Sequence, residues 1–96
     1  MKIISYDEFI QKMEVDIPSF EKFKKLGDMT ALFERQKNDF IQLNYERGSL
    51  LYALISKLKP KNIIEFGTAR GYSTLCMAWA LSDNNLQGHI HTIDPF

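Results

Sequence analysis

The strongest constraint on the fold of this chain is the order strand, helix, strand over roughly 30 residues near the end of its sequence. Residues 62–66 form a short run with β-branched side chains and no clean alternation, which is typical of a strand buried on both faces. Residues 72–81 are uncharged and apolar nearly all round, which predicts a helix packed on more than one side. A second strand over residues 89–93 ends before Pro95, because proline cannot continue a central ladder. This order predicts a βαβ unit with two parallel strands and a right-handed crossover.

Residues 1–59 are expected to form helices that precede this unit. They hold ten Lys or Arg and nine Asp or Glu, so the charge-poor residues 60–96 are expected to lie closer to the core. Apolar side chains at helical spacing predict helices over residues 6–13 and 46–58. The apolar side chains that repeat on one face of the second of these helices are Leu50, Leu51, Leu54, Ile55 and Leu58. The predicted fold class is therefore α/β, with a helical preamble over residues 1–59 and one βαβ unit over residues 60–96.

Local signals set the expected ends of the other helices. Ser5 precedes the first helix, with a glutamate three positions later, which is the spacing of a capping box. Gly27 is expected to end a second short helix that begins near Pro18. Asp28 is expected to cap a third helix that runs to about Leu43.

Two features meet at the carboxyl ends of the predicted strands, where open α/β sheets bind their ligands. The first is a glycine loop, in which Gly67 and Gly71 lack Cβ atoms and let the backbone turn tightly and approach a ligand. The backbone N–H groups of Gly71, Tyr72 and Ser73 start the following helix, where an anionic group is favoured. The second is Asp94, whose ionised carboxylate can accept hydrogen bonds from both hydroxyls of a ribose. Together they predict a nucleoside-like ligand that carries an acidic group.

The loop lacks residues that two common nucleotide-binding motifs require. No lysine follows Gly71, so the loop is not a P-loop for ATP or GTP. Ala69 stands where the dinucleotide fingerprint has its middle glycine, which disfavours NAD or FAD without excluding them. A nicotinamide-dependent oxidoreductase therefore stays an alternative.

The segment from Glu65 to Ser73, EFGTARGYS, resembles the E-x-G-x-x-x-G-Y-S form of the first motif of class I S-adenosylmethionine-dependent methyltransferases. It is most similar to the small-molecule O-methyltransferase-like branch. Residues 92–96 resemble the end of the second strand of that fold, with Asp94 in the acidic ribose-binding position. The resemblance covers residues 60–96 and implies a Rossmann-like methyltransferase fold, incomplete here, with S-adenosylmethionine as the cofactor and a small molecule as the acceptor.

The resemblance also implies a role for each residue of the loop. Those expected to meet the methionine part of the cofactor are Glu65, Gly67, Gly71 and Ser73. Those expected to shape the loop or its wall are Thr68, Ala69 and Tyr72. Asp94 is expected to hold the ribose. Elementary electrostatics agrees at two points, because a carboxylate near the cationic sulfonium is favourable and the amino-acid carboxylate of the cofactor suits a helix N-terminus.

In enzymes of this kind the acceptor-binding, general-base and metal-binding residues lie further along the chain, so no catalytic and no metal-ligating residue is expected within these 96 residues. A two-stranded parallel sheet is not a stable core by itself. The chain is therefore expected to be the N-terminal portion of a larger protein or to need a partner or a second copy, and not to transfer methyl groups alone. An alternative that is not an enzyme is a non-catalytic βαβ module that adds its strand edge to the sheet of a partner.

Composition limits which partners and which cellular compartment are expected for this chain. Twelve Lys or Arg balance twelve Asp or Glu, so no positive excess exists to bind nucleic acid or an anionic membrane. The single cysteine, Cys76, cannot form an internal disulfide, and it is expected in the core. No apolar run approaches the roughly 20 residues that span a bilayer, so a cytoplasmic protein is expected. His89 and His91 share one strand face without a third ligand, so a metal site is not expected.

Overall fold

The computed structural model describes residues 3–35, 45–67 and 71–94, with the side chains of residues 31–35 left out. In the described part the elements are, in order, α1 (Tyr6–Met13), α2 (Phe20–Arg35), α3 (Tyr45–Leu58), β1 (Asn62–Phe66), α4 (Tyr72–Asp83) and β2 (His89–Ile93). This arrangement confirms the predicted α/β class, in which N-terminal helices precede one βαβ unit. The boundary expected at residue 60 stays a prediction, and side chains from both sides of it share one hydrophobic cluster.

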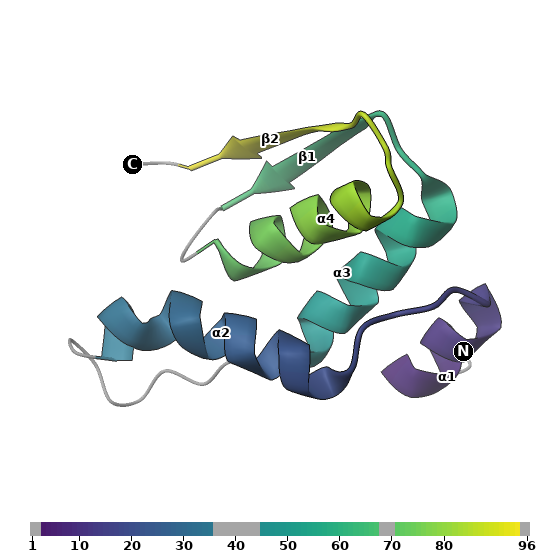
Figure 1. Ribbon diagram of the computed structural model, residues 1–96, viewed down its shortest axis with the longest axis horizontal. Coiled ribbons are helices and arrows are strands. Elements are labelled where there is room, and N and C mark those ends of the chain that lie inside the picture. Colours follow the sequence, from purple (N-terminus) through teal and green to yellow (C-terminus); the bar gives the residue numbers. More distant parts are fainter. Residues whose placement is uncertain (1–2, 36–44, 68–70, 95–96) are drawn as a thin grey trace.

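The two strands pair in parallel, as the βαβ order predicts. Their register places Asn62 beside His89 at one end and Phe66 beside Ile93 at the other. Figure 1 shows α4 packed beneath the pair and the other helices on the same side of the sheet. The carboxyl ends of β1 and β2 therefore lie together, at the end where α4 begins.

One face of the sheet is exposed, and the prediction that the first strand is buried on both faces is wrong for the described chain. Ile63 and Ile90 pack against the cluster under the sheet. On the alternate positions, the exposed fractions are 64% for Ile64, 81% for Phe66 and 52% for Ile93. Successive strand residues point to opposite faces, and in the described part helices cover only one of them.

The second and third predicted helices form one continuous helix, α2, so the predicted break at Gly27 and Asp28 is wrong. A Cβ on Gly27 would lie 2.6 Å from a ring atom of Tyr45, so the glycine makes room for that ring. Asp28 accepts a hydrogen bond from the Tyr45 hydroxyl at 2.6 Å and does not cap a helix. Both residues serve a tertiary contact that local signals do not reveal. The predicted end near Leu43 lies outside the described residues.

The first helix follows its local signals. The Ser5 hydroxyl accepts a hydrogen bond from the Glu8 amide at 3.2 Å, as the predicted cap requires. Ile10 and Met13 are buried, and they pack against Ala53 of α3.

Helix α3 buries small and aromatic side chains together with Ile55 of the predicted stripe. Its buried residues are Gly48, Ser49, Tyr52, Ala53, Ile55 and Ser56. The leucines of that stripe that are half-buried and pack against the core are Leu50, Leu51 and Leu54. Leu58 is 68% exposed, in contrast to the predicted apolar stripe. Helix α3 packs along α4, and small side chains let two helix backbones approach closely.

The centre of the core lies between α2, α3 and α4. Phe23 packs against Tyr52 and Trp79 with ring centroids 5.9 and 5.0 Å away. Cys76 is fully buried, which confirms its predicted place in the core. Burial raises the pKa of its thiol to about 11, so the reactive thiolate is disfavoured at neutral pH. Within the described segments, no helix combines the length and the apolar character that crossing a bilayer requires.

Replacing Gly48 by alanine tests the close contact between α3 and α4. A Cβ there would lie 2.2 Å from the Tyr72 hydroxyl oxygen and 2.8 Å from the Cys76 sulfur. We expect Gly48→Ala to lower the free energy of unfolding by about 1 to 3 kcal/mol, although alanine favours helix by about 1 kcal/mol. Urea unfolding measures the change, with the exposed Lys57→Ala on the same helix as the control. A Gly48→Ala variant as stable as the wild type would contradict this packing.

Candidate functional site

The candidate site begins where the two strands leave the sheet. The amide of Gly67 donates a hydrogen bond to the carbonyl of Ile93 at 2.7 Å, which extends the ladder by one step beyond Phe66. Asp94 follows Ile93 directly and is exposed. The structure therefore brings the glycine loop and Asp94 to one edge, as the sequence predicts.

Both glycines of the loop have a backbone conformation that favours glycine. Gly67 and Gly71 each have φ of 86°, in the left-handed region that other residues rarely adopt. In the described part of the chain, a Cβ on either glycine would have no atom within 4 Å outside the adjoining residues. The need for glycine here therefore comes from the backbone turn and not from a crowded neighbour.

Helix α4 starts at this edge without a side-chain hydrogen bond from its N-cap residue, Gly71, and without an acidic residue in its own first turn. The carbonyl of Gly71 accepts from the amide of Leu75 at 2.8 Å, so the helix begins directly after the loop. The first amides of a helix have no partner within the helix, and the helix dipole favours negative charge beside them. This end of α4 suits a carboxylate or another anionic group.

Glu65 is connected to the same helix turn. Its side chain is on the helix-facing side of β1 and half-buried, and its Oε1 accepts a hydrogen bond from the Thr74 hydroxyl. This contact joins the end of β1 to the first turn of α4 across the glycine loop. Sequence reasoning did not identify Thr74. Strand alternation, which turns Glu65 toward the helix, was the signal that could have found a polar partner there.

The remaining predicted residues divide into three groups. Tyr72 is buried, and its hydroxyl donates to the carbonyl of Tyr45 at 2.9 Å, so its side chain turns into the core while its backbone stays at the start of α4. Ser73 is half-buried in the same turn. Thr68 and Ala69 lie outside the described residues. The contacts expected between these residues and a cofactor stay predictions.

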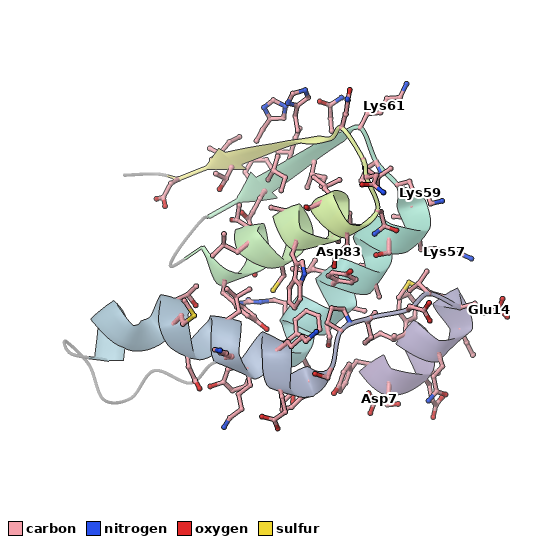
Figure 2. All side chains as sticks on the ribbon, viewed as in Figure 1. Asp7, Glu14, Lys57, Lys59, Lys61 and Asp83 are labelled. Atoms are coloured by element: carbon pink, nitrogen blue, oxygen red, sulfur yellow. The ribbon has the colours of Figure 1, made fainter. Side chains whose placement is uncertain are left out.

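Three positive side chains lie at the opposite end of the sheet. Figure 2 shows Lys57, Lys59 and Lys61 where α3 ends and β1 begins, away from the carboxyl ends of the strands. These lysines therefore do not approach the loop edge. In the described part, an anionic group at that edge would meet the amides of α4.

Two other features of the described residues are a pair of histidines and a groove beside α4. His89 and His91 are exposed, with ring centroids 6.4 Å apart, and the described residues include no group of three or more side chains that could hold a metal ion. A groove of about 570 Å³ lies between α2 and α4, and Leu26, Met29 and Trp79 are among the residues that line it. The groove borders the outer side of α4 rather than the glycine loop.

Comparison with known proteins finds a protein family whose model matches most of the chain. A model of the O-methyltransferase family matches residues 13–95. The match includes α2 and α3 as well as the βαβ unit, so it extends beyond the 60–96 segment on which the sequence resemblance rests. No match was found among curated proteins or among solved structures.

Replacing Thr74 tests the connection between β1 and α4. Thr74→Val keeps the shape of the side chain but removes the hydroxyl that donates to Glu65. We expect it to lower the free energy of unfolding by about 1 to 2 kcal/mol, because a half-buried carboxylate loses a hydrogen bond. Thr74→Ser keeps the hydroxyl and serves as the control in the same urea unfolding experiment. Equal stability of the two variants would show that the contact contributes nothing.

Proposed function

The chain belongs to the O-methyltransferase family, and from this premise we propose that its glycine loop and Asp94 bind S-adenosylmethionine for methyl transfer to a small-molecule hydroxyl. The single observation that supports the proposal most is the hydrogen bond from the Gly67 amide to the Ile93 carbonyl. This bond sets the start of the loop beside the strand end that continues into Asp94. Methyltransferase family membership implies the cofactor, and the edge offers groups that suit its carboxylate, its ribose and its sulfonium.

Each group at the edge is assigned to a different part of the cofactor. The amides at the start of α4, near Ser73, favour the carboxylate of the methionine part. The carboxylate of Asp94 accepts hydrogen bonds, which suits the two ribose hydroxyls. Glu65 adds a negative charge near the loop, where a cationic sulfonium is favoured, and the Thr74 hydroxyl orients that carboxylate.

In this proposal the described residues bind the cofactor. The methyl group then passes to the oxygen of an acceptor molecule. When bound, S-adenosylmethionine supplies a methyl group on a positively charged sulfur. Transfer requires an acceptor oxygen in line with that methyl group, so holding the cofactor in one orientation contributes much of the rate. We assign to the loop, the start of α4 and Asp94 the task of fixing that orientation. The cytoplasmic compartment stays the expectation from the sequence.

Titration with S-adenosylhomocysteine tests the proposal. This compound is the product that S-adenosylmethionine leaves after methyl transfer. It keeps the ribose and the amino-acid carboxylate and lacks the positive charge on sulfur, so its binding reports on Asp94 and the start of α4. We expect saturable heat in isothermal titration calorimetry. We expect Asp94→Ala to weaken binding roughly 10- to 100-fold, since hydrogen bonds to a charged group contribute about 1.5 to 3 kcal/mol.

The control for this titration is an aspartate far from the edge. Asp7 lies on α1, away from the sheet, and Asp7→Ala should bind like the wild type. Absence of saturable heat, or equal affinities for Asp94→Ala and the wild type, would overturn the proposal. A fluorescence change with NADH in place of the analogue would favour a nicotinamide-dependent oxidoreductase.

A further inference from the structure

The residue that starts α4 also makes a hydrogen bond to the start of α3. We propose that Tyr72 is a positioning residue for the cofactor, and that through Tyr45 it makes the placement of the α4 start depend on α2 and α3. This inference rests on the proposed function and extends it to residues outside the glycine loop. It is carried by three sets of contacts.

The first contact joins the starts of two helices. Tyr72 is the first residue of α4 and directly follows Gly71, and its side chain is only 4% exposed. Its hydroxyl donates to the carbonyl of Tyr45, the first residue of α3, at 2.9 Å. The hydrogen bond therefore connects the turn that offers amides to the cofactor with the start of α3.

The second contact is between the end of the Tyr72 ring and the backbone of α3 at Gly48. Gly48 is one turn into α3, and a Cβ there would lie 2.6 Å from the ring carbon that bears the hydroxyl. The absence of a side chain at Gly48 thus makes room for the end of the Tyr72 ring between the two helices. The ring can occupy this place only when α3 and α4 keep their observed separation.

The third set of contacts fixes Tyr45 against α2. The Tyr45 hydroxyl donates to Oδ1 of Asp28 at 2.6 Å, and its ring lies over Gly27. The ring also makes an edge-to-face contact with Phe20, with centroids 6.1 Å apart. Contacts from α2 therefore hold Tyr45, whose carbonyl accepts the hydrogen bond from the Tyr72 hydroxyl.

These contacts matter because the N-cap residue does not fix the start of α4 by a side-chain hydrogen bond. Gly71 has left-handed backbone geometry and gives no side-chain hydrogen bond to α4. The position of the first amides therefore depends on the neighbours of the first turn, which are Thr74 with Glu65 on one side and Tyr72 with Tyr45 on the other. A small displacement of these amides would weaken the contact with the cofactor carboxylate.

Two matched tyrosine variants test the inference. Tyr52 is also 4% exposed, and its hydroxyl donates to Asp83 at 2.5 Å, but Asp83 is the last residue of α4. Figure 2 places Asp83 at the end of the helix away from the loop edge. Tyr72→Phe and Tyr52→Phe each remove one buried hydroxyl from the same core, so both should lower the midpoint of thermal unfolding by similar amounts.

Affinity for S-adenosylhomocysteine separates the two variants. We expect Tyr72→Phe to weaken binding about 3- to 10-fold and Tyr52→Phe to bind like the wild type. Binding and positioning are reciprocal, so the analogue should slow hydrogen exchange of the amides at the start of α3 in the wild type and in Tyr52→Phe, but much less in Tyr72→Phe. A residue that only stabilises the core would not produce this difference.

The outcomes distinguish this inference from the proposed function. If the wild type does not bind the analogue, the proposed function fails. If the wild type binds and the two tyrosine variants have equal affinities, the role of Tyr72 is overturned and the proposed function stands. Should Tyr72→Phe fail to fold, Asp28→Ala is the second test. Asp28 is half-buried on α2, and its replacement removes the acceptor of the Tyr45 hydroxyl. We expect this variant to bind S-adenosylhomocysteine about 2- to 3-fold more weakly. An unchanged affinity in Asp28→Ala would then overturn the inference.

Discussion

The parallel pairing of β1 and β2 over α4 is the constraint on which the rest of this structure depends. The crossover through α4 returns the chain to the end of the sheet where β1 begins, so both parallel strands have their carboxyl ends at one edge. The bond from Gly67 to Ile93 extends this pairing to the first residue of the loop. Open α/β sheets bind their ligands at the carboxyl ends of their strands, so we expect a ligand site at that edge before any side chain is considered.

Three separate parts of the chain supply the edge. The loop supplies a backbone turn with left-handed glycines, α4 supplies amides with partial positive charge, and Asp94 supplies a carboxylate. Gly71 at the N-cap gives α4 no side-chain hydrogen bond, and hydrogen bonds of Thr74 and Tyr72 connect the first turn of the helix to β1 and to α3. In the proposed site, α2 and α3 thus act through these contacts, and the O-methyltransferase family match includes both helices.

The sequence was sufficient for the features that local rules determine. Both strands, the parallel crossover and the Ser5 cap could be predicted, because each depends on residues close in the chain. The features that failed depend on distant partners. Gly27 has the sequence signal of a helix end, yet it makes room for the Tyr45 ring, and the exposed face of Ile64 depends on which layers cover the sheet. The burial of Tyr72 required a glycine 24 positions earlier in the chain, and no local pattern connects the two.

A crystal structure of the protein with S-adenosylhomocysteine tests the central claim most directly. The account predicts density at the carboxyl edge of the sheet, with the ribose hydroxyls within hydrogen-bond distance of the Asp94 carboxylate and the amino-acid carboxylate at the first amides of α4. Density for the ligand in the groove between α2 and α4, or an Asp94 carboxylate that makes no contact with the ribose, would contradict it.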